Sequence, residues 1–281
     1  MKMNMSRRNF LLSVGASALA GVAIGKGIMK PAFAHADQAI GVQLYTVRDA
    51  MAEDMATTLE RVAAIGYREV EFAGYFDKPL AEIKAMLEHN GLTAPSAHMS
   101  PEVFENDFDR ALEIADALGH KNLILPWLPP EQRSLDRFRE IAHILNVTGE
   151  KAKAAGVKVG YHNHEFEFIA EGGVTPFDVL MADTDADLVN FELDLFWLAT
   201  AKKAPLPLME KLKGRVPCVH VKDMDGQGNM VSVGDGEIDF KSVFEHRKEA
   251  GLKHFFVEHD NPKDPFESIK RSFEAFSKVV A

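Results

Sequence analysis

Histidine and acidic side chains gather at the carboxyl ends of several short apolar runs in this 281-residue chain. The clearest case is VGYHNHEFEF, residues 159–168, where His162 and His164 are followed by Glu165 and Glu167. In a β-strand, side chains two positions apart share one face, so the two imidazoles would point the same way. Imidazole and carboxylate groups together are typical ligands of divalent transition metals.

Five further runs end in the same manner. A single histidine or acid at such a position is commonly a surface residue or a helix cap. Carboxylates that converge from several strands would repel one another unless protons or a cation neutralised them, so a divalent metal accounts for the whole set. The side chains at these five ends are Glu69 and Glu71; His98; Glu192 and Asp194; His220, Lys222 and Asp223; and Glu258, His259 and Asp260.

From Ala39 onward, β-rich runs alternate with longer helical patterns. Amphipathic segments at 55–66, 108–119 and 134–156 each end on glycine, a common helix stop. Eight such βα units predict a single (β/α)8 TIM barrel, whose chemistry lies at the carboxyl ends of the strands. The rival is a doubly wound open sheet, but no Gly-rich phosphate fingerprint follows the first run. The eight runs are residues 39–45, 69–74, 93–99, 122–128, 158–164, 189–195, 216–223 and 254–260.

The first 36 residues contain five bases and no acid. Within them SRRNFLL (6–12) resembles a twin-arginine export signal, and AFAHA (32–36) offers A-x-A cleavage sites after Ala34 or Ala36. The apolar stretch between them is short and Gly-rich for a stable membrane span, although a retained anchor is the alternative. We therefore expect residues 1–36 to be a cleavable signal read by the twin-arginine export machinery. Residues 37–281 would then be a periplasmic barrel with no membrane span.

Charge and cysteine content restrict the partners of this body. Loss of the five leader bases would change the net charge from −10 to −15. Such an acidic body repels phosphate backbones, so nucleic acid is not expected as a partner. The chain has one cysteine, Cys218, and therefore no internal disulfide.

From about Ile40 onward the chain resembles the xylose-isomerase-like barrel family of sugar isomerases and epimerases, also called sugar phosphate isomerase/epimerases. The segments that carry the resemblance are GVQLYTVRD, GYHNHEFEF, FELDLFWL, VHVKDMD and FVEHD. The family's usual metal set is Glu, Asp, His and Glu from strands five to eight. Asp194, His220 and Glu258 match the last three members, whereas His162 stands at the place of the first.

The resemblance thus implies one divalent metal held by His162, Asp194, His220 and Glu258. Imidazole and carboxylate ligands favour Mn²⁺, Fe²⁺, Co²⁺ or Zn²⁺ over Mg²⁺. Two carboxylates and two neutral imidazoles leave the site one unit more positive than the family set, which makes it a stronger Lewis acid. An imidazole that ligates the metal also cannot serve as a carboxylate base, so elimination or hydration becomes a candidate alongside isomerisation.

The resemblance also implies an activity and roles for other residues. The expected enzyme is a metal-dependent carbohydrate isomerase or epimerase that acts on a sugar or keto-sugar through an enediolate. Glu258 is the family's candidate base, and Glu165 could replace the missing strand-five carboxylate. His164 and Lys222 would stabilise negative charge or move protons. The remaining side chains would contact substrate: Glu71 and His98 by hydrogen bonds to hydroxyls, and Trp127 by covering a sugar face, unless it only packs at the rim.

Three alternatives remain open at this point. The first is a metal-dependent lyase or hydratase of 3-keto-glycosides. The second is an abasic-site endonuclease on the same fold, which the acidic body disfavours. The third is a non-catalytic exported sugar-binding protein, which would need carbohydrate contacts but no metal, so that a measurement of bound metal separates it from the enzymes.

Overall fold

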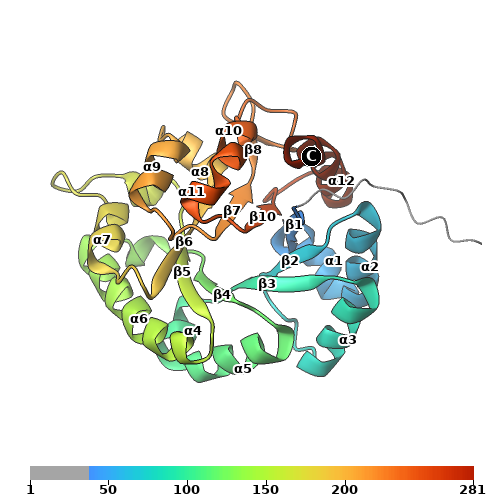
Figure 1. Ribbon diagram of the computed structural model, residues 1–281, viewed down its shortest axis with the longest axis horizontal. Coiled ribbons are helices and arrows are strands. Elements are labelled where there is room, and N and C mark those ends of the chain that lie inside the picture. Colours follow the sequence, from blue (N-terminus) through green and yellow to red (C-terminus); the bar gives the residue numbers. More distant parts are fainter. Residues whose placement is uncertain (1–37) are drawn as a thin grey trace, which may run out of the picture. The chain divides into compact units, whose positions relative to one another are not determined.

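A computed structural model of the chain describes residues 38–281. Within them, eight parallel strands close into a barrel in the order β1-β10-β7-β6-β5-β4-β3-β2. Figure 1 shows the strands at the centre and the helices around them. The predicted (β/α)8 barrel is therefore confirmed, whereas the predicted export signal lies outside the described residues. The barrel strands are β1 (Gly41–Gln43), β2 (Glu69–Phe72), β3 (Thr93–His98), β4 (Asn122–Leu125), β5 (Lys158–His162), β6 (Val189–Asp194), β7 (Cys218–Val221) and β10 (His254–Val257).

Helices connect the strands, and their ends follow local sequence signals. Helix α6 begins after Ser134, whose side chain accepts a hydrogen bond from the N–H of Arg137. Helix α5 ends at Gly119, which has a left-handed φ of 83° that glycine adopts at little cost. The α-helices are α1 (Arg48–Glu53), α2 (Met55–Ile65), α3 (Leu80–Asn90), α4 (Pro101–Asn106), α5 (Phe108–Leu118), α6 (Leu135–Ala154), α7 (Pro176–Asp183), α8 (Leu195–Thr200), α9 (Pro205–Lys211), α10 (Phe240–Glu245), α11 (Arg247–Ala250) and α12 (Pro265–Val280). The 3-10 helices are η1 (Leu44–Val47), η2 (Pro130–Gln132) and η3 (Phe166–Phe168).

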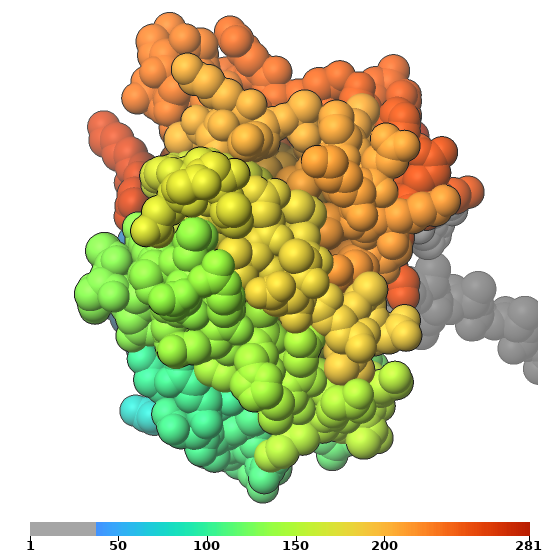
Figure 2. All heavy atoms as spheres, turned by 90° about the vertical axis from the view of Figure 1, so that its left-hand side faces the viewer, coloured from blue at the N-terminus to red at the C-terminus, as the bar shows by residue number. Residues whose placement is uncertain are grey.

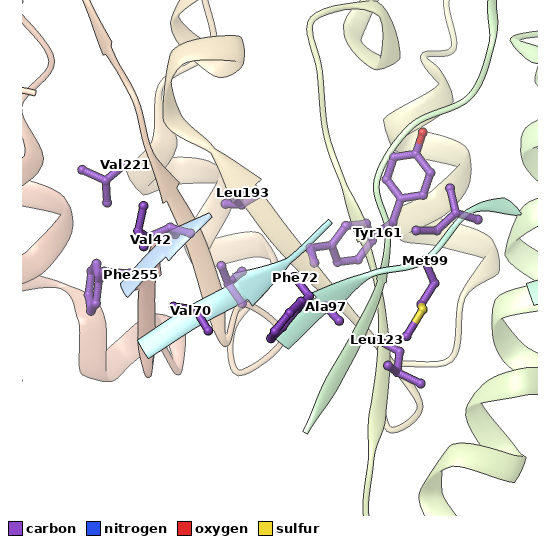
Figure 3. Close-up of a cluster of buried hydrophobic side chains, with 14 of the residues drawn as sticks. Val42, Val70, Phe72, Ala97, Met99, Leu123, Tyr161, Leu193, Val221 and Phe255 are labelled. Carbon is purple, nitrogen blue, oxygen red and sulfur yellow. The ribbon is translucent and has the colours of Figure 1, made fainter. Parts of the chain in front are cut away.

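The apolar core lies between the strands and the surrounding helices. Val42, Val70, Phe72 and Leu193 are fully buried on this side of the sheet, and Figure 3 shows them with their neighbours on adjoining strands. Because side chains alternate along a strand, the residues between them point into the barrel. Figure 2 shows one outer face, where the light green to orange segments, including α6, α7 and α9, form a continuous layer.

One element was not predicted from the sequence. After β7 the chain forms a small antiparallel pair of strands, β8 (Asp223–Met224) and β9 (Met230–Val231). The buried carboxylate of Asp223 anchors the loop that follows, because it accepts hydrogen bonds from the N–H groups of Met224, Gly234, Gly236 and Ile238. Among residues 38–281, no helix is long and apolar enough to cross a membrane.

Candidate metal centre and active site

Strand register brings the predicted ligands together at the carboxyl end of the barrel. Asp194 on β6 is the direct register partner of His220 on β7. β6 also pairs with β5, and there Glu192 is the register partner of His162. All four side chains are buried. Glu258 follows β10 directly, and its N–H bonds to the carbonyl of Val221 on β7.

The four predicted ligands form one buried cluster. Oδ2 of Asp194 lies 3.2 Å from Nε2 of His162 and 3.6 Å from Nδ1 of His220. The same Nδ1 lies 2.7 Å from Oε2 of Glu258. The structure therefore joins His162, Asp194, His220 and Glu258 through two atoms, Oδ2 of Asp194 and Nδ1 of His220.

The part of the cluster around Asp194 fits a metal ion. Two ligand atoms on one tetrahedral metal lie about 3.4 Å apart, because the bonds are about 2.1 Å long, and both contacts of Asp194 are close to this value. The ligand atoms of His162, Asp194 and His220 are close enough together to hold one ion, and Nδ1 of His220 is enclosed without a partner in hydrogen-bond geometry among the described residues. Glu258 lies beside them, with its Oε2 2.7 Å from Nδ1 of His220 and 2.9 Å from Nζ of Lys222.

Second contacts set the orientation of both imidazole rings. Nδ1 of His162 lies 3.1 Å from the carbonyl oxygen of Pro126, an acceptor, so this nitrogen carries the proton and Nε2 is left for the cluster. Nε2 of His220 lies 2.7 Å from Oε2 of Glu71, so here Nδ1 is left for the cluster. A carbonyl or carboxylate behind each ring is the usual arrangement around metal-ligating histidines.

Lys222 places a fixed positive charge beside the cluster. Its Nζ lies 3.0 Å from Oδ2 of Asp194, 2.9 Å from Oε2 of Glu258 and 2.8 Å from Oδ1 of Asp260. Burial alone would lower the pKa of Lys222, but the carboxylates of Asp194, Glu258 and Asp260 outweigh it and hold the pKa well above its usual value. Lys222 is therefore an ammonium ion within the barrel.

The electrostatics of Asp194 and Asp260 differ although both contact this ammonium. Burial would raise the pKa of Asp194, but Lys222 and His162 keep it well below the usual range. Asp260 has a raised pKa, because burial and the charge of Glu258 outweigh its contact with Lys222. Asp194 is thus the firmly ionised acid of the pair.

A second group of side chains, Glu71, His98, Glu192 and His220, lies next to the cluster, and its members are separated by hydrogen-bond distances. Nε2 of His98 lies 2.7 Å from Oε2 of Glu192, and Nε2 of His220 lies 2.7 Å from Oε2 of Glu71. These atoms are close enough together to be considered for a metal, but separations of 2.7 Å are shorter than two ligands on one ion adopt. Gln43 and Ser96 also donate to Glu71, at 2.7 and 2.5 Å. We therefore assign this group as a hydrogen-bonded layer.

The pKa shifts in this layer favour ionised Glu192 and make the imidazole of His98 a stronger base. Burial would raise the pKa of Glu192, but His220 and His98 keep it well below its usual value. Burial would lower the pKa of His98, but Glu71 and Glu192 raise it overall.

The three residues predicted to contact substrate differ in how far they are exposed. Glu71 is fully buried, and its two oxygens are engaged by Gln43, Ser96 and His220. His98 retains 11% side-chain exposure. Trp127 is 42% exposed, and Arg133 lies over its ring.

Two side chains predicted to move protons, Glu165 and His164, differ in their contacts with the cluster. Glu165 is half-buried and makes no side-chain hydrogen bond or ion pair within residues 38–281. His164 lies against the cluster, with its ring centroid 4.9 Å from that of His162. Burial, His162 and Lys222 lower the pKa of His164 well below its usual value, so this imidazole is neutral.

Three residues at the site were not predicted as functional. Glu192 precedes Asp194 by two positions and was noted with it at the end of its strand, but no role was assigned to it from the sequence. Asp260 stands two after Glu258 in FVEHD, but only the structure shows its pairing with Lys222. Trp197 lies 5.3 Å from the His164 ring and 5.8 Å from Nζ of Lys222, and its N–H is enclosed without a partner among the described residues.

Comparisons with known proteins agree with the barrel fold. A family model described as a xylose isomerase-like TIM barrel matches residues 59–279. An inosose dehydratase of Lacticaseibacillus casei is 23% identical over 252 residues, which cover 74% of this chain and 84% of the relative. A 2-oxo-tetronate isomerase of Haemophilus influenzae is 26% identical over 216 residues, 68% of this chain and 82% of the relative. The crystal structure of a sugar phosphate isomerase/epimerase from Parabacteroides distasonis has 27% identity and a TM-score of 0.76, covering 88% of this chain and 97% of that one.

Proposed function

Because the chain belongs to the xylose isomerase-like TIM barrel family, we propose that it is a metal-dependent enzyme that removes a proton beside the carbonyl of a keto-sugar or keto-polyol. The observation that carries the proposal is the buried group of His162, Asp194 and His220, whose ligand atoms are close enough together to hold one ion, with Glu258 2.7 Å from Nδ1 of His220. A divalent ion held there would act as a Lewis acid toward the carbonyl and hydroxyl oxygens of the substrate.

Three side chains next to the cluster would surround the reacting carbons of the substrate: Lys222, His164 and Trp197. Lys222 adds a permanent positive charge beside the cluster, which stabilises an enediolate oxygen as negative charge develops. His164 is a neutral imidazole against the same cluster and can donate or accept a proton. Trp197 packs against both His164 and Lys222 and excludes water from this side of the site.

Elimination of water is the outcome that the residues favour. The carboxylate of Glu258 contacts both Lys222 and His220, and strand five offers His162 in place of a second carboxylate. A pair of carboxylate bases for plain epimerisation is therefore missing. An ammonium group that can hydrogen-bond a departing hydroxyl is present instead. The likeness to inosose dehydratases supports this lyase proposal, and 3-keto-glycosides remain candidate substrates.

Isomerisation is the second candidate. The similarity to a 2-oxo-tetronate isomerase and to a sugar phosphate isomerase/epimerase supports it. Both reactions begin with the same proton removal, and they differ in whether a hydroxyl then leaves or a proton returns to a neighbouring carbon.

The test begins with metal content. Purified full-length protein is loaded with Mn²⁺, Co²⁺, Zn²⁺ or Mg²⁺ and assayed on inosose, a ketose and a 3-keto-glycoside in deuterated water. We expect about one ion per chain, and deuterium exchange or loss of water that depends on it. His220→Ala should lose the ion and the reaction, while His143→Ala, at an exposed position on α6, should keep both. A wild-type protein without stoichiometric metal would favour the sugar-binding alternative.

A further inference from the structure

The proposed reaction requires a base, and the nominated carboxylates are poorly placed to serve. Glu258 is only 5% exposed, and its Oε2 contacts both His220 and Lys222, so this oxygen is committed to the cluster. Glu165 is half-buried, and among residues 38–281 no hydrogen bond or ion pair joins its side chain to the cluster. Another side chain must therefore reach a substrate that lies against the cluster.

His98 has the geometry of an oriented base. It is the last residue of β3, and its ring centroid lies 5.3 Å from that of His162 and 5.2 Å from that of His220. The ring thus touches both imidazoles of the proposed metal site. A substrate held at that site by its oxygens would present its carbon atoms within reach of His98.

Glu192 fixes which nitrogen of His98 faces outward. Its carboxylate is completely buried, and its Oε2 lies 2.7 Å from Nε2 of His98. The Nε2–H group therefore donates to Glu192, and the lone pair lies on Nδ1. This Nδ1 has no hydrogen-bond partner among residues 38–281 and, unlike Nδ1 of His164, it is not enclosed by protein atoms. A buried carboxylate behind an imidazole whose other nitrogen is free is the arrangement that orients a general base.

We propose that His98, oriented by Glu192, is the catalytic base that removes the substrate's C–H proton, an inference that rests on the proposed function. The proton passes from the carbon beside the carbonyl to Nδ1 of His98. The C–H electron pair forms a carbon–carbon double bond, and the carbonyl π electrons move onto oxygen.

In the dehydration, that proton is delivered to the hydroxyl on the next carbon. The electrons on the enolate oxygen re-form the carbonyl, and the enolate double-bond pair shifts to form a new double bond to the carbon that carries the hydroxyl. The hydroxyl departs as water with the electrons of its C–O bond, and His98 returns to its starting state. Glu192 touches no substrate atom in this sequence, so its role is that of a positioning residue. No oxidant or further reactant is needed.

The first test measures proton removal directly. Zn²⁺-loaded wild type, His98→Gln and Glu192→Gln are compared for deuterium incorporation into inosose next to its carbonyl. We expect His98→Gln to lose about 100-fold or more in rate with metal content and KM retained, as for removal of a general base. Glu192→Gln should lose about tenfold. His254→Gln is the matched control, because His254 also pairs with a carboxylate, Glu69, at 2.9 Å, but at the first residues of β10 and β2, the end of the barrel away from the cluster.

A second measurement does not depend on turnover. Two-bond ¹H–¹⁵N spectra of the Zn²⁺-loaded protein report which ring nitrogen of each histidine carries hydrogen. We expect the Nε2–H form for His98 in the wild type and a mixture of forms in Glu192→Gln. In His98→Ala, added imidazole should restore part of the deuterium incorporation.

The outcomes separate this inference from the proposed function. Near-wild-type incorporation by metal-loaded His98→Gln overturns the role of His98, as does an Nδ1–H form in the wild type. If the wild type incorporates no deuterium into any keto substrate, the proposed function fails and the base assignment fails with it, whereas the spectra still decide whether Glu192 orients the ring.

Discussion

His220 serves two sets of partners at once. Its Nδ1 faces Asp194 and Glu258, and its Nε2 faces Glu71. At the scale of single residues, the behaviour of the metal site therefore depends on a carboxylate that the ion itself does not touch.

Replacement of Glu71 by glutamine should weaken metal binding. The amide oxygen would still accept from Nε2 of His220, but it carries no charge and makes the imidazole a weaker ligand. Loss of such an outer partner typically costs about 10- to 100-fold in affinity. Competition with a chromophoric chelator for Zn²⁺ measures the change. Glu69→Gln removes a histidine-paired carboxylate from the same strand and should leave the affinity unchanged. Equal affinities of Glu71→Gln and wild type would contradict the assignment.

Replacement of His162 by glutamate separates the two candidate reactions. The metal should remain bound, because a carboxylate oxygen offers a ligand at similar reach, but the site gains a negative charge. A reaction that depends on strong polarisation should slow by roughly tenfold for each 1.4 kcal/mol of lost stabilisation. Activity on inosose or a 3-keto-glycoside should fall, whereas activity on a ketose should hold or rise. Unchanged activity on both substrate classes would show that this account of His162 is wrong.

At the scale of elements, two loops that follow barrel strands are each held by a buried acid. Asp223 holds the segment after β7, and Glu167 holds the segment after β5. Oε1 of Glu167 accepts from the hydroxyl of Tyr161 and Oε2 from the N–H of His164, both at 2.7 Å. These contacts fix the backbone from which His164 projects.

Asp223→Ala should loosen the loop that spans residues 224–238. Four backbone N–H groups lose their acceptor, and hydrogen bonds to a charged group contribute about 1.5–3 kcal/mol each before water replaces part of the loss. We expect faster hydrogen exchange and faster proteolysis within this loop. Asp225→Ala provides the control, because half-buried Asp225 accepts hydrogen bonds from Gln227 and Asn229, both at the tip of the loop. Equal protection in the two variants would argue against an anchoring role.

Glu167 should make stability depend on pH. Burial raises the pKa of Glu167 to about 8 despite its two hydrogen bonds. Between a pKa of about 4.3 in the unfolded chain and about 8 in the folded one, the folded state holds more protons, so the free energy of unfolding falls as pH rises. Glu167→Gln cannot ionise and should lose less stability between pH 5 and pH 8. Urea unfolding at both values measures this difference, and an identical pH dependence in the two proteins would refute it.

The elements were predictable to different degrees. The strands and their polar ends follow from alternation and from the helical patterns between them, so the eight strands and the clustering of His162, Asp194, His220 and Glu258 were expected. The β8–β9 pair was not, because its residues lack an alternating apolar pattern and depend on the single side chain of Asp223. Glu71 and His98 were predicted as substrate contacts, but their pairing with His220 and Glu192 in one hydrogen-bonded layer was not predicted. Its members come from strands far apart in sequence, and only the closed barrel determines which carboxylate meets which imidazole.

At the scale of the whole molecule, the export prediction remains to be tested. Replacement of both Arg7 and Arg8 by lysine should leave precursor in the cytoplasm if SRRNFLL is a twin-arginine signal. Cell fractionation measures the distribution, and N-terminal sequencing of exported protein should give a start at His35 or Asp37. Normal export of the double variant would rule out this pathway, whereas the same variant should leave metal binding by the barrel unaffected.

The contact between Glu71 and His220 joins residues 149 positions apart in the chain. During synthesis, Glu71 emerges long before the imidazole that it must meet, and closing so long a segment is entropically costly and slow. Gln43 of β1 and Ser96 of β3 can donate to Glu71 early, but its contact with His220 forms only when β7 arrives. Completion of the barrel is then a late and concerted event of folding, in which this contact selects the fully closed ring over any partial sheet.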